Sequence, residues 1–195
     1  MLPVAAHAGD SGTAYLQLGS NGVGLGYAVS VANDWAVRGQ YNTFKQSFSG
    51  DVGDFGAGSV LAIDLKLDSL QLLGDWYPSD GGFRVSGGVV INNNKITVAG
   101  TGNVNNIPAT VNAEVKLSDG LTPYVGIGFS TRPKDAKGFG FIADLGIMFQ
   151  NPKSTLTATG AVTQGDIDTQ NAKIQDAINK LKTMPVLAFG VSYSF

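Results

Sequence analysis

Apolar and polar residues alternate along most of the chain with the period of two that is typical of β-strands. The clearest case is the last segment, where every second residue from Leu187 to Phe195 is large and apolar and the residues between are Ala, Gly or Ser. The same alternation recurs over residues 23–31, 35–42, 83–91, 123–129 and 139–149. A soluble sandwich would bury the large face in a core, whereas a membrane barrel turns it to lipid and keeps small and polar residues inside.

The spacing of turn residues favours the barrel. Compact connectors at 32–34, 78–82 and 131–138 alternate with longer ones at 50–58, 101–108 and 150–183, which is the loop asymmetry of transmembrane barrels. The pattern predicts an all-β fold: an eight-stranded antiparallel up-and-down transmembrane β-barrel over residues 9–195, as a single domain with both ends on the periplasmic side. The predicted strands are 13–20, 22–31, 35–48, 58–77, 83–99, 109–130, 138–150 and 184–195.

Two segments depart from the simple pattern. Along residues 59–77 the apolar residues change parity, which predicts a β-bulge or break near Asp68 and Ser69. Residues 166–182, within the last long loop, carry Ile and Leu at helical spacing and predict a short amphipathic helix. We expect this helix to cover a barrel rim; a plug, a lid and a partner-binding helix are the alternatives.

Composition narrows the function classes. Charged residues make up 14% of the chain, against the ~25% of an ordinary soluble domain, and the formal net charge of −2 argues against a nucleic-acid partner. The sequence has no run of ~18 consecutive apolar residues, so it predicts no transmembrane helix. The chain has no Cys and one His, His7, in a segment 1–8 that we interpret as the remaining end of a signal peptide. We therefore expect no catalytic residues, no metal site and no cofactor.

Aromatic residues stand where strands should meet a membrane interface. Trp35, Trp76 and Tyr77 lie beside predicted short turns, and Tyr193 and Phe195 lie at the C-terminus. Trp and Tyr favour that interface because the ring is apolar while its polar group stays wet. The sequence therefore predicts an aromatic girdle at the periplasmic end, with core aromatics of a soluble sandwich as the alternative.

Four charged residues fall on the inward parity: Arg38, Asp75, Arg84 and Asp144. Each lies a few residues from a short turn, so they should share one height in the periplasmic half of the lumen. An eight-stranded barrel is just wide enough for side chains to fill it, and buried charges need partners. We expect an interior salt-bridge network that blocks free flow. A gate or a polar site for a small solute is the functional alternative.

The C-terminus Gly190-Val-Ser-Tyr-Ser-Phe195 resembles the assembly signal of outer-membrane proteins, in which Gly190, Tyr193 and Phe195 match and Ala188 replaces the usual polar residue. More broadly the chain is similar to small barrels of the OmpA, OmpX and OmpW class. The segments that carry this likeness are residues 75–78, 82–84, 92–95, 123–128 and 143–150. The resemblance implies a bacterial outer-membrane location and recognition by the barrel-assembly machinery, and it assigns no activity. The lipid A-modifying barrel enzymes match poorly, because their catalytic His is absent.

These observations support one function hypothesis and two alternatives. The first is an outer-membrane barrel with a mostly filled lumen, a monomer surrounded by outer-membrane lipid and lipopolysaccharide, that acts through its external loops. The second is a passive channel for small solutes, hydrophobic ones included. A membrane enzyme ranks last, since each inward Asp has an Arg neighbour that should keep it ionised. The polar run Asn92–Lys95 is expected to be a solvated strand end.

Overall fold

The computed structural model describes residues 12–51, 60–104, 107–118, 120–130, 137–160 and 163–195. The predicted signal-peptide remnant at 1–8 lies outside these residues. The described elements are β1 (Gly12–Gly19), β2 (Gly22–Ala32), β3 (Trp35–Asp51), β4 (Val60–Trp76), β5 (Phe83–Asn92), β6 (Lys95–Val104), β7 (Ile107–Lys116), β8 (Gly120–Ser130), β9 (Gly138–Phe149), β10 (Lys153–Thr159), α1 (Gln164–Ile178), a 3₁₀ turn (Asn179–Leu181) and β11 (Thr183–Ser194).

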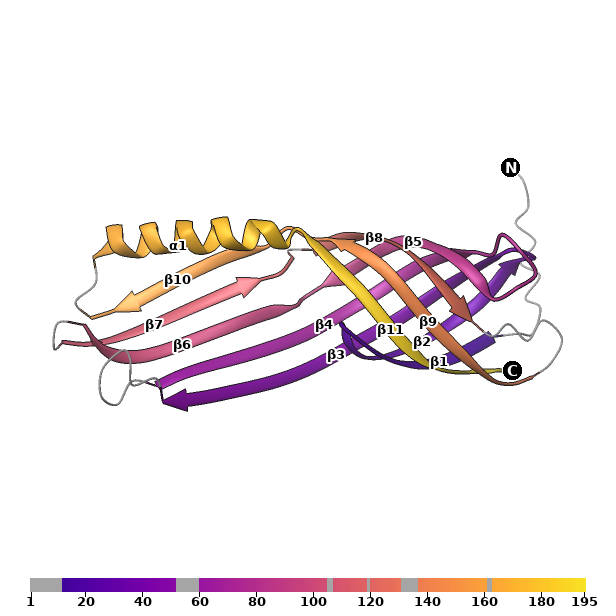
Figure 1. The fold of residues 1–195 in the computed structure, drawn as a ribbon, viewed down its shortest axis with the longest axis horizontal. Coiled ribbons are helices and arrows are strands. Elements are labelled where there is room, and N and C mark those ends of the chain that lie inside the picture. Colours follow the sequence, from indigo (N-terminus) through magenta and orange to yellow (C-terminus); the bar gives the residue numbers. More distant parts are fainter. Residues whose placement is uncertain (1–11, 52–59, 105–106, 119, 131–136, 161–162) are drawn as a thin grey trace.

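Eight strands close into the predicted antiparallel barrel (Figure 1). The ring runs β1, β2, β3, β4, β5, β8, β9 and β11; β11 pairs back onto β1, and the β4–β5 pairing completes the circle. Closure leaves no free edge in the membrane-spanning part, where an unpaired backbone group would be costly. The start of β1 and the C-terminal residue lie at the same end of the barrel, where the Phe195 N–H donates to the Gly12 carbonyl oxygen at 3.0 Å.

The alternation of the sequence becomes the two sides of this barrel. Leu187, Phe189 and Val191 of β11 are exposed by 46–59%, whereas Ser192 and Ser194 of the same strand are buried. Because paired residues of neighbouring strands share a face, the outward apolar positions join into one continuous belt. The described residues contain no helix long and apolar enough to cross a membrane.

Part of the same sheet continues beyond one end of the barrel. The strands β3 and β4 have 17 residues each and run on past their neighbours. β6 pairs with Val60–Lys66 of β4, and β7 and β10 follow in the sheet. We call this part the extension: Phe44–Asp51 of β3, Val60–Leu67 of β4, and the whole of β6, β7, β10 and α1.

The extension corrects four sequence predictions. The single strand expected at 83–99 is two strands, β5 and β6, and the one at 109–130 is β7 and β8. The loop expected at 150–183 contains β10, which pairs with β7. The connector expected at 101–108 is strand except for residues 105–106, which are not described. Strand counting missed this because a strand that leaves the membrane keeps its period of two.

No β-bulge or break occurs near Asp68. β4 is continuous there, and its pairing with β3 stays in register through Thr43–Asp68 and Asn42–Ser69. The apolar residues change parity because the surroundings of the strand change. In the barrel the outward Leu70 and Leu72 are apolar, and in the extension the inward Leu65 and Leu67 are. The polarity of the two faces therefore inverts between Leu67 and Ser69. The outward face is apolar in the barrel, and the inward face is apolar in the extension.

A buried polar junction holds the extension to the barrel. Asn92 is the last residue of β5, and Asn94 directly precedes β6; each is 1% exposed. The Asp68 backbone N–H donates to Asn94 Oδ1 at 2.7 Å, and Asn92 Nδ2 donates to Gln150 Oε1 at 3.3 Å. The prediction of a solvated strand end is thus wrong: where β4 changes partner from β6 to β5, these amides satisfy backbone groups that the sheet leaves unpaired.

The helix α1 belongs to the extension and does not enter the lumen (Figure 1). It begins at Gln164, two residues before the predicted start, and the 3₁₀ turn continues it to Leu181. It lies along β10, where Ser154 Oγ donates to Asn171 Oδ1 at 2.9 Å and Ser154 N donates to Gln175 Oε1 at 2.9 Å. Ile178 is buried, whereas Leu181 is 47% exposed.

Candidate functional site

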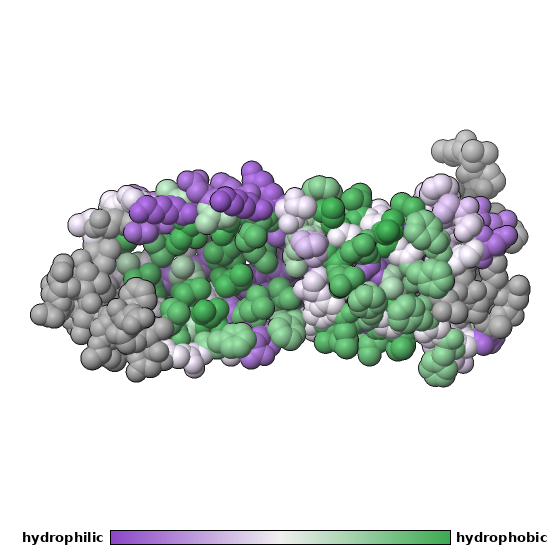
Figure 2. Space-filling model, viewed as in Figure 1, coloured by the Kyte–Doolittle hydropathy of each residue, from purple (hydrophilic) through white to green (hydrophobic). Residues whose placement is uncertain are grey.

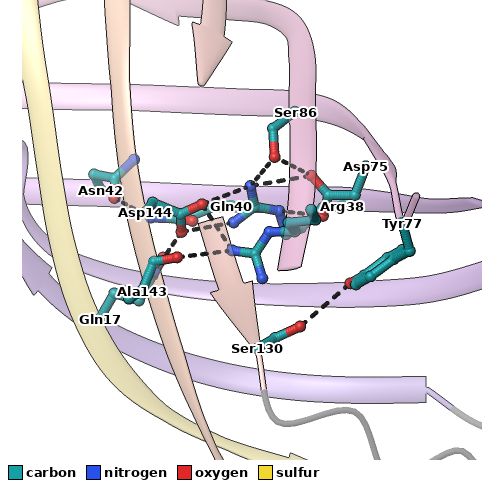
Figure 3. A network of polar contacts seen from close by, with 11 residues as sticks. Gln17, Arg38, Gln40, Asn42, Asp75, Tyr77, Ser86, Ser130, Ala143 and Asp144 are labelled. Atoms are coloured by element: carbon teal, nitrogen blue, oxygen red, sulfur yellow. Dashed lines mark hydrogen bonds and ion pairs between the residues drawn. The ribbon is translucent and has the colours of Figure 1, made fainter. Parts of the chain in front are cut away.

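The four inward charges form one network inside the barrel (Figure 3). Arg38 from β3 lies at its centre: Nε is 2.8 Å from Asp75 Oδ2, and Nη1 is 3.0 Å from Asp144 Oδ2. Arg84 from β5 reaches Asp144 Oδ1 at 2.7 Å and Asp75 Oδ2 at 3.6 Å. Two arginines therefore share two carboxylates, and the four side chains are only 1–6% exposed.

Neutral polar groups complete this network. Gln17 Nε2 donates to Asp144 Oδ2 at 2.6 Å, and Ser86 Oγ donates to Asp75 Oδ1 at 2.6 Å. The guanidinium carbon of Arg38 also lies 5.9 Å from the Tyr15 ring centre, in cation–π geometry. Sequence reasoning missed Gln17, Ser86 and Tyr15; their inward parity was a usable signal, but uncharged residues did not stand out among many inward polar ones.

The network spans the lumen because it draws on strands from around the ring. Asp144 comes from β9, and it faces Arg38 and Asp75 from β3 and β4 on the other side. Glycines leave room for the large side chains: a Cβ on Gly128 would lie 2.9 Å from both Arg84 Nε and Asp144 Oδ1. The ion pairs and the packing around them thus fill the lumen at the height of the network.

Above the network the lumen is also filled. Leu73, Val90, Tyr124, Met148 and Val186 form a buried apolar cluster. Beside them a cavity of ≈ 10 Å³, enough for about one water, is lined by carboxamides and reaches Arg38 and Asp144. The amides on its wall are Gln17, Asn21, Gln40, Asn42 and Gln71. The cavity is far smaller than the 300–1,000 Å³ typical of a small-molecule site.

The extension presents the second candidate surface, its inner face. Register places Leu61, Ile63 and Leu65 of β4 on this face, opposite Ile96 and Val98 of β6. Figure 2 shows apolar residues gathered on this side of the extension, below the polar surface of α1. At its β3 edge Phe44 and Phe48 are 39% and 59% exposed. Among inward residues with described side chains on β3, β4, β6, β7 and β10 of the extension, none is charged.

The predicted interface aromatics lie at the short β2–β3 and β4–β5 turns, with one correction to their orientation. Trp35 and Trp76 are opposite each other, 50% and 43% exposed, and their rings stack with centres 6.5 Å apart. Tyr77 is only 8% exposed, and its hydroxyl lies 3.4 Å from Ser130 Oγ. Tyr77 therefore packs inside the barrel end and does not face lipid. The alternation that oriented the strand residues ends at Trp76, so it could not orient Tyr77.

Gly190 and Tyr193 of the predicted assembly signal lie on β11, and Phe195 follows its last residue, Ser194. Tyr193 is 37% exposed and packs edge-on against Phe139 and Phe195, each with ring centres 5.1 Å apart. Gly190 is opposite Gln17 of β1, where a Cβ would lie 2.0 Å from the Leu16 carbonyl oxygen. The barrel seam therefore requires glycine at this position for its own packing.

Comparison with solved structures identifies the fold. CarO2 of Acinetobacter baumannii matches with a TM-score of 0.64 and 21% identity over 95% of this chain and 98% of that one. CarO of the same organism matches with a TM-score of 0.63 and 21% identity over 94% of this chain and 97% of that one. This chain has the β-barrel fold of the CarO proteins. A weaker match is Ail, the attachment invasion locus protein of Yersinia pestis, which was solved in complex with the heparin analogue sucrose octasulfate. Its TM-score is 0.41, with 13% identity over 95% of this chain and 96% of that one.

No family model and no curated protein matches the sequence. Within the described residues, no group of three His, Cys, Asp or Glu side chains is placed to hold a metal ion. The arrangement that remains is a barrel closed by ion pairs and an apolar face beyond it.

Proposed function

We propose that this barrel does not pass solutes and that it acts through the extension, on the outside of the cell. The observation that carries the proposal is the filled lumen, in which the charge network is at most 6% exposed and the adjoining cavity holds about one water. Each carboxylate of the network is held by arginine, so we also propose a non-enzymatic role.

The half-buried apolar inner face of the extension supports an interaction role. Soluble surfaces rarely expose contiguous apolar patches unless these bind something. The described lining is uncharged, while the outer face of the same strands carries charged residues such as Lys45, Asp64 and Lys95. An uncharged, apolar partner is the chemistry that this face complements, because a charged ligand would lose its hydration there without a counter-charge.

Membrane lipid and the assembly machinery are the other proposed partners. The outward belt would face outer-membrane lipid and lipopolysaccharide, and the predicted assembly signal with Gly190, Tyr193 and Phe195 would be recognised during biogenesis. We propose a monomer, because pairing within the chain already closes the barrel.

Ion conductance through planar bilayers tests the proposal. Wild-type protein should give no conductance steps in KCl, because the network and the apolar cluster fill the lumen. Arg84→Ala should leak, since it removes the 2.7 Å partner of Asp144 and leaves a space beside the existing cavity.

Lys95→Ala is the matched control, because the Lys95–Glu114 ion pair of 3.4 Å lies on the extension. It should stay as tight as wild type. Steady conductance in the wild-type protein would contradict the proposal and favour the passive channel.

A further inference from the structure

Half of the ten lysines of the chain lie in a single row. The register makes each one the direct cross-strand partner of the next, over five adjacent strands. In sheet order they are Lys45, Lys66, Lys95, Lys116 and Lys153. Since neighbouring strands lie ~4.8 Å apart, the row is about 19 Å long.

All five point to the outer face, at a fixed height above the lipid-facing belt. Tyr41 of β3 and Leu70 of β4 are opposite each other and are the last large apolar residues that face outward before the extension. Lys45 lies four residues beyond Tyr41, and Lys66 lies four residues from Leu70. At ~3.3 Å per residue this is about 13 Å along a tilted strand, the level of lipid headgroups.

The acidic residues near the row do not neutralise it. Within two residues along these strands there are three carboxylates, those of Asp64, Asp68 and Glu114, against five lysines. Asp68 lies 3.6 Å from Lys66, and Glu114 lies 3.4 Å from Lys95. Asp64 accepts a hydrogen bond from Ser47. Within the described residues, neither Lys45 nor Lys116 has an ion-pair partner.

Such a row is unfavourable by itself. Directly opposite side chains of a sheet have Cβ atoms about 4.5–5.5 Å apart, and like charges there destabilise the pairing. Five in succession are best explained by an anion that bridges them. Lys side chains bind phosphate as point charges and attract anionic membrane surfaces.

We propose that the lysine row binds the phosphate groups of lipopolysaccharide in the outer leaflet and fixes the height of the barrel in the membrane. The row lies just above the lipid-facing belt, on the outer face only, so the anions it meets are those of the surrounding leaflet. This proposal rests on the membrane placement proposed above. Its failure would leave the conductance result unchanged, so the two can be told apart.

The test measures binding of diphosphoryl lipid A to the detergent-solubilised full-length protein by native mass spectrometry. Lys45→Gln/Lys116→Gln removes the two lysines without a described carboxylate partner. At about fivefold per lysine, its affinity should fall roughly twenty-fivefold. Lys45→Arg/Lys116→Arg should restore most of it. Lys173→Gln/Lys180→Gln, which removes two exposed lysines of α1 and the 3₁₀ turn, should bind like wild type.

Three further arms define the ligand. Dephosphorylated lipid A should bind wild type at least as weakly as the double variant binds the phosphorylated form. Added NaCl should weaken wild-type binding. Inorganic phosphate should compete poorly, because it cannot bridge several lysines.

Equal affinities of the row variant and the α1 control, or full competition by inorganic phosphate, would overturn the proposal. Heat-dependent gel migration verifies that each variant is folded, so a loss of binding cannot come from unfolding.

Discussion

Asp144 is the residue on which the interior depends most. It accepts hydrogen bonds from Arg38, Arg84 and Gln17, and its side chain is 6% exposed. Removing one member of a buried ionic network leaves the others desolvated and uncompensated, which costs far more than losing an exposed pair.

Asp144→Asn should therefore destabilise the barrel by about 3–5 kcal/mol, because two buried arginines would then share one carboxylate. The measurement is the urea midpoint in lipid vesicles, followed by heat-dependent gel migration. Asp68→Asn is the matched control: its pair with Lys66 is 3.6 Å long with side chains 38% and 25% exposed, and it should cost at most about 0.5 kcal/mol. Equal effects of the two changes would show that the network is not what stabilises the interior.

Gly190→Ala should weaken the seam between β1 and β11. Its Cβ would lie 2.0 Å from the Leu16 carbonyl oxygen and 2.8 Å from Gln17 Cα, so backbone must move. The expected cost is about 1–3 kcal/mol, seen as a smaller fraction of folded protein after refolding into vesicles. Gly39→Ala, whose Cβ would meet nothing within 4 Å, serves as control. If Gly190→Ala folds as fully as Gly39→Ala, the close approach at the seam has no energetic weight.

At the scale of elements, polarity along each strand records its surroundings. Where alternation faces lipid it gave the correct side for most residues, and inward parity was enough to select Arg38, Asp75, Arg84 and Asp144 before any contact was known. The extension escaped prediction because its strands keep the same period while the apolar side reverses. Periodicity reports that a strand has two unlike faces, not which of them meets water. The buried Asn92–Asn94 junction was not predicted for a related reason. Buried amides that bond to strand ends have the same composition as a solvated loop.

Val98→Asp should abolish binding of an apolar ligand to the inner face of the extension. A carboxylate on this face would be desolvated without a partner, so affinity should fall at least about tenfold. The measurement is saturable labelling by a diazirine-bearing aliphatic alcohol in lipid nanodiscs, mapped by mass spectrometry. Ala99→Asp places the same charge one residue away on the outer face, opposite the uncharged Ala62 and Asn112, and should label like wild type. Labelling that does not saturate in the wild-type protein, or that both variants keep, would show that the face does not bind apolar molecules.

The whole molecule joins a closed barrel and an open extension of opposite polarity. The lower part has an apolar outside and a polar, ion-paired inside; the upper part has a charged outside and an apolar inside. The change occurs between Leu67 and Ser69, at the level where β4 exchanges β6 for β5. This inversion is the main reason to place the membrane boundary there, since one chain satisfies both solvents only if each part stays in its own. We place the extension outside the cell because the short turns β2–β3 and β4–β5 lie at the opposite end of the barrel.

Residue accessibility in intact cells tests that placement most directly, because the chain has no cysteine to interfere. Thr157→Cys lies on exposed β10 of the extension, and Ser79→Cys lies in the exposed turn before β5, at the opposite end of the barrel. In a Gram-negative host, a membrane-impermeant maleimide should label Thr157→Cys in intact cells and Ser79→Cys only after the outer membrane is permeabilised. Labelling of Ser79→Cys but not Thr157→Cys in intact cells would contradict the account, because the extension would then face the periplasm.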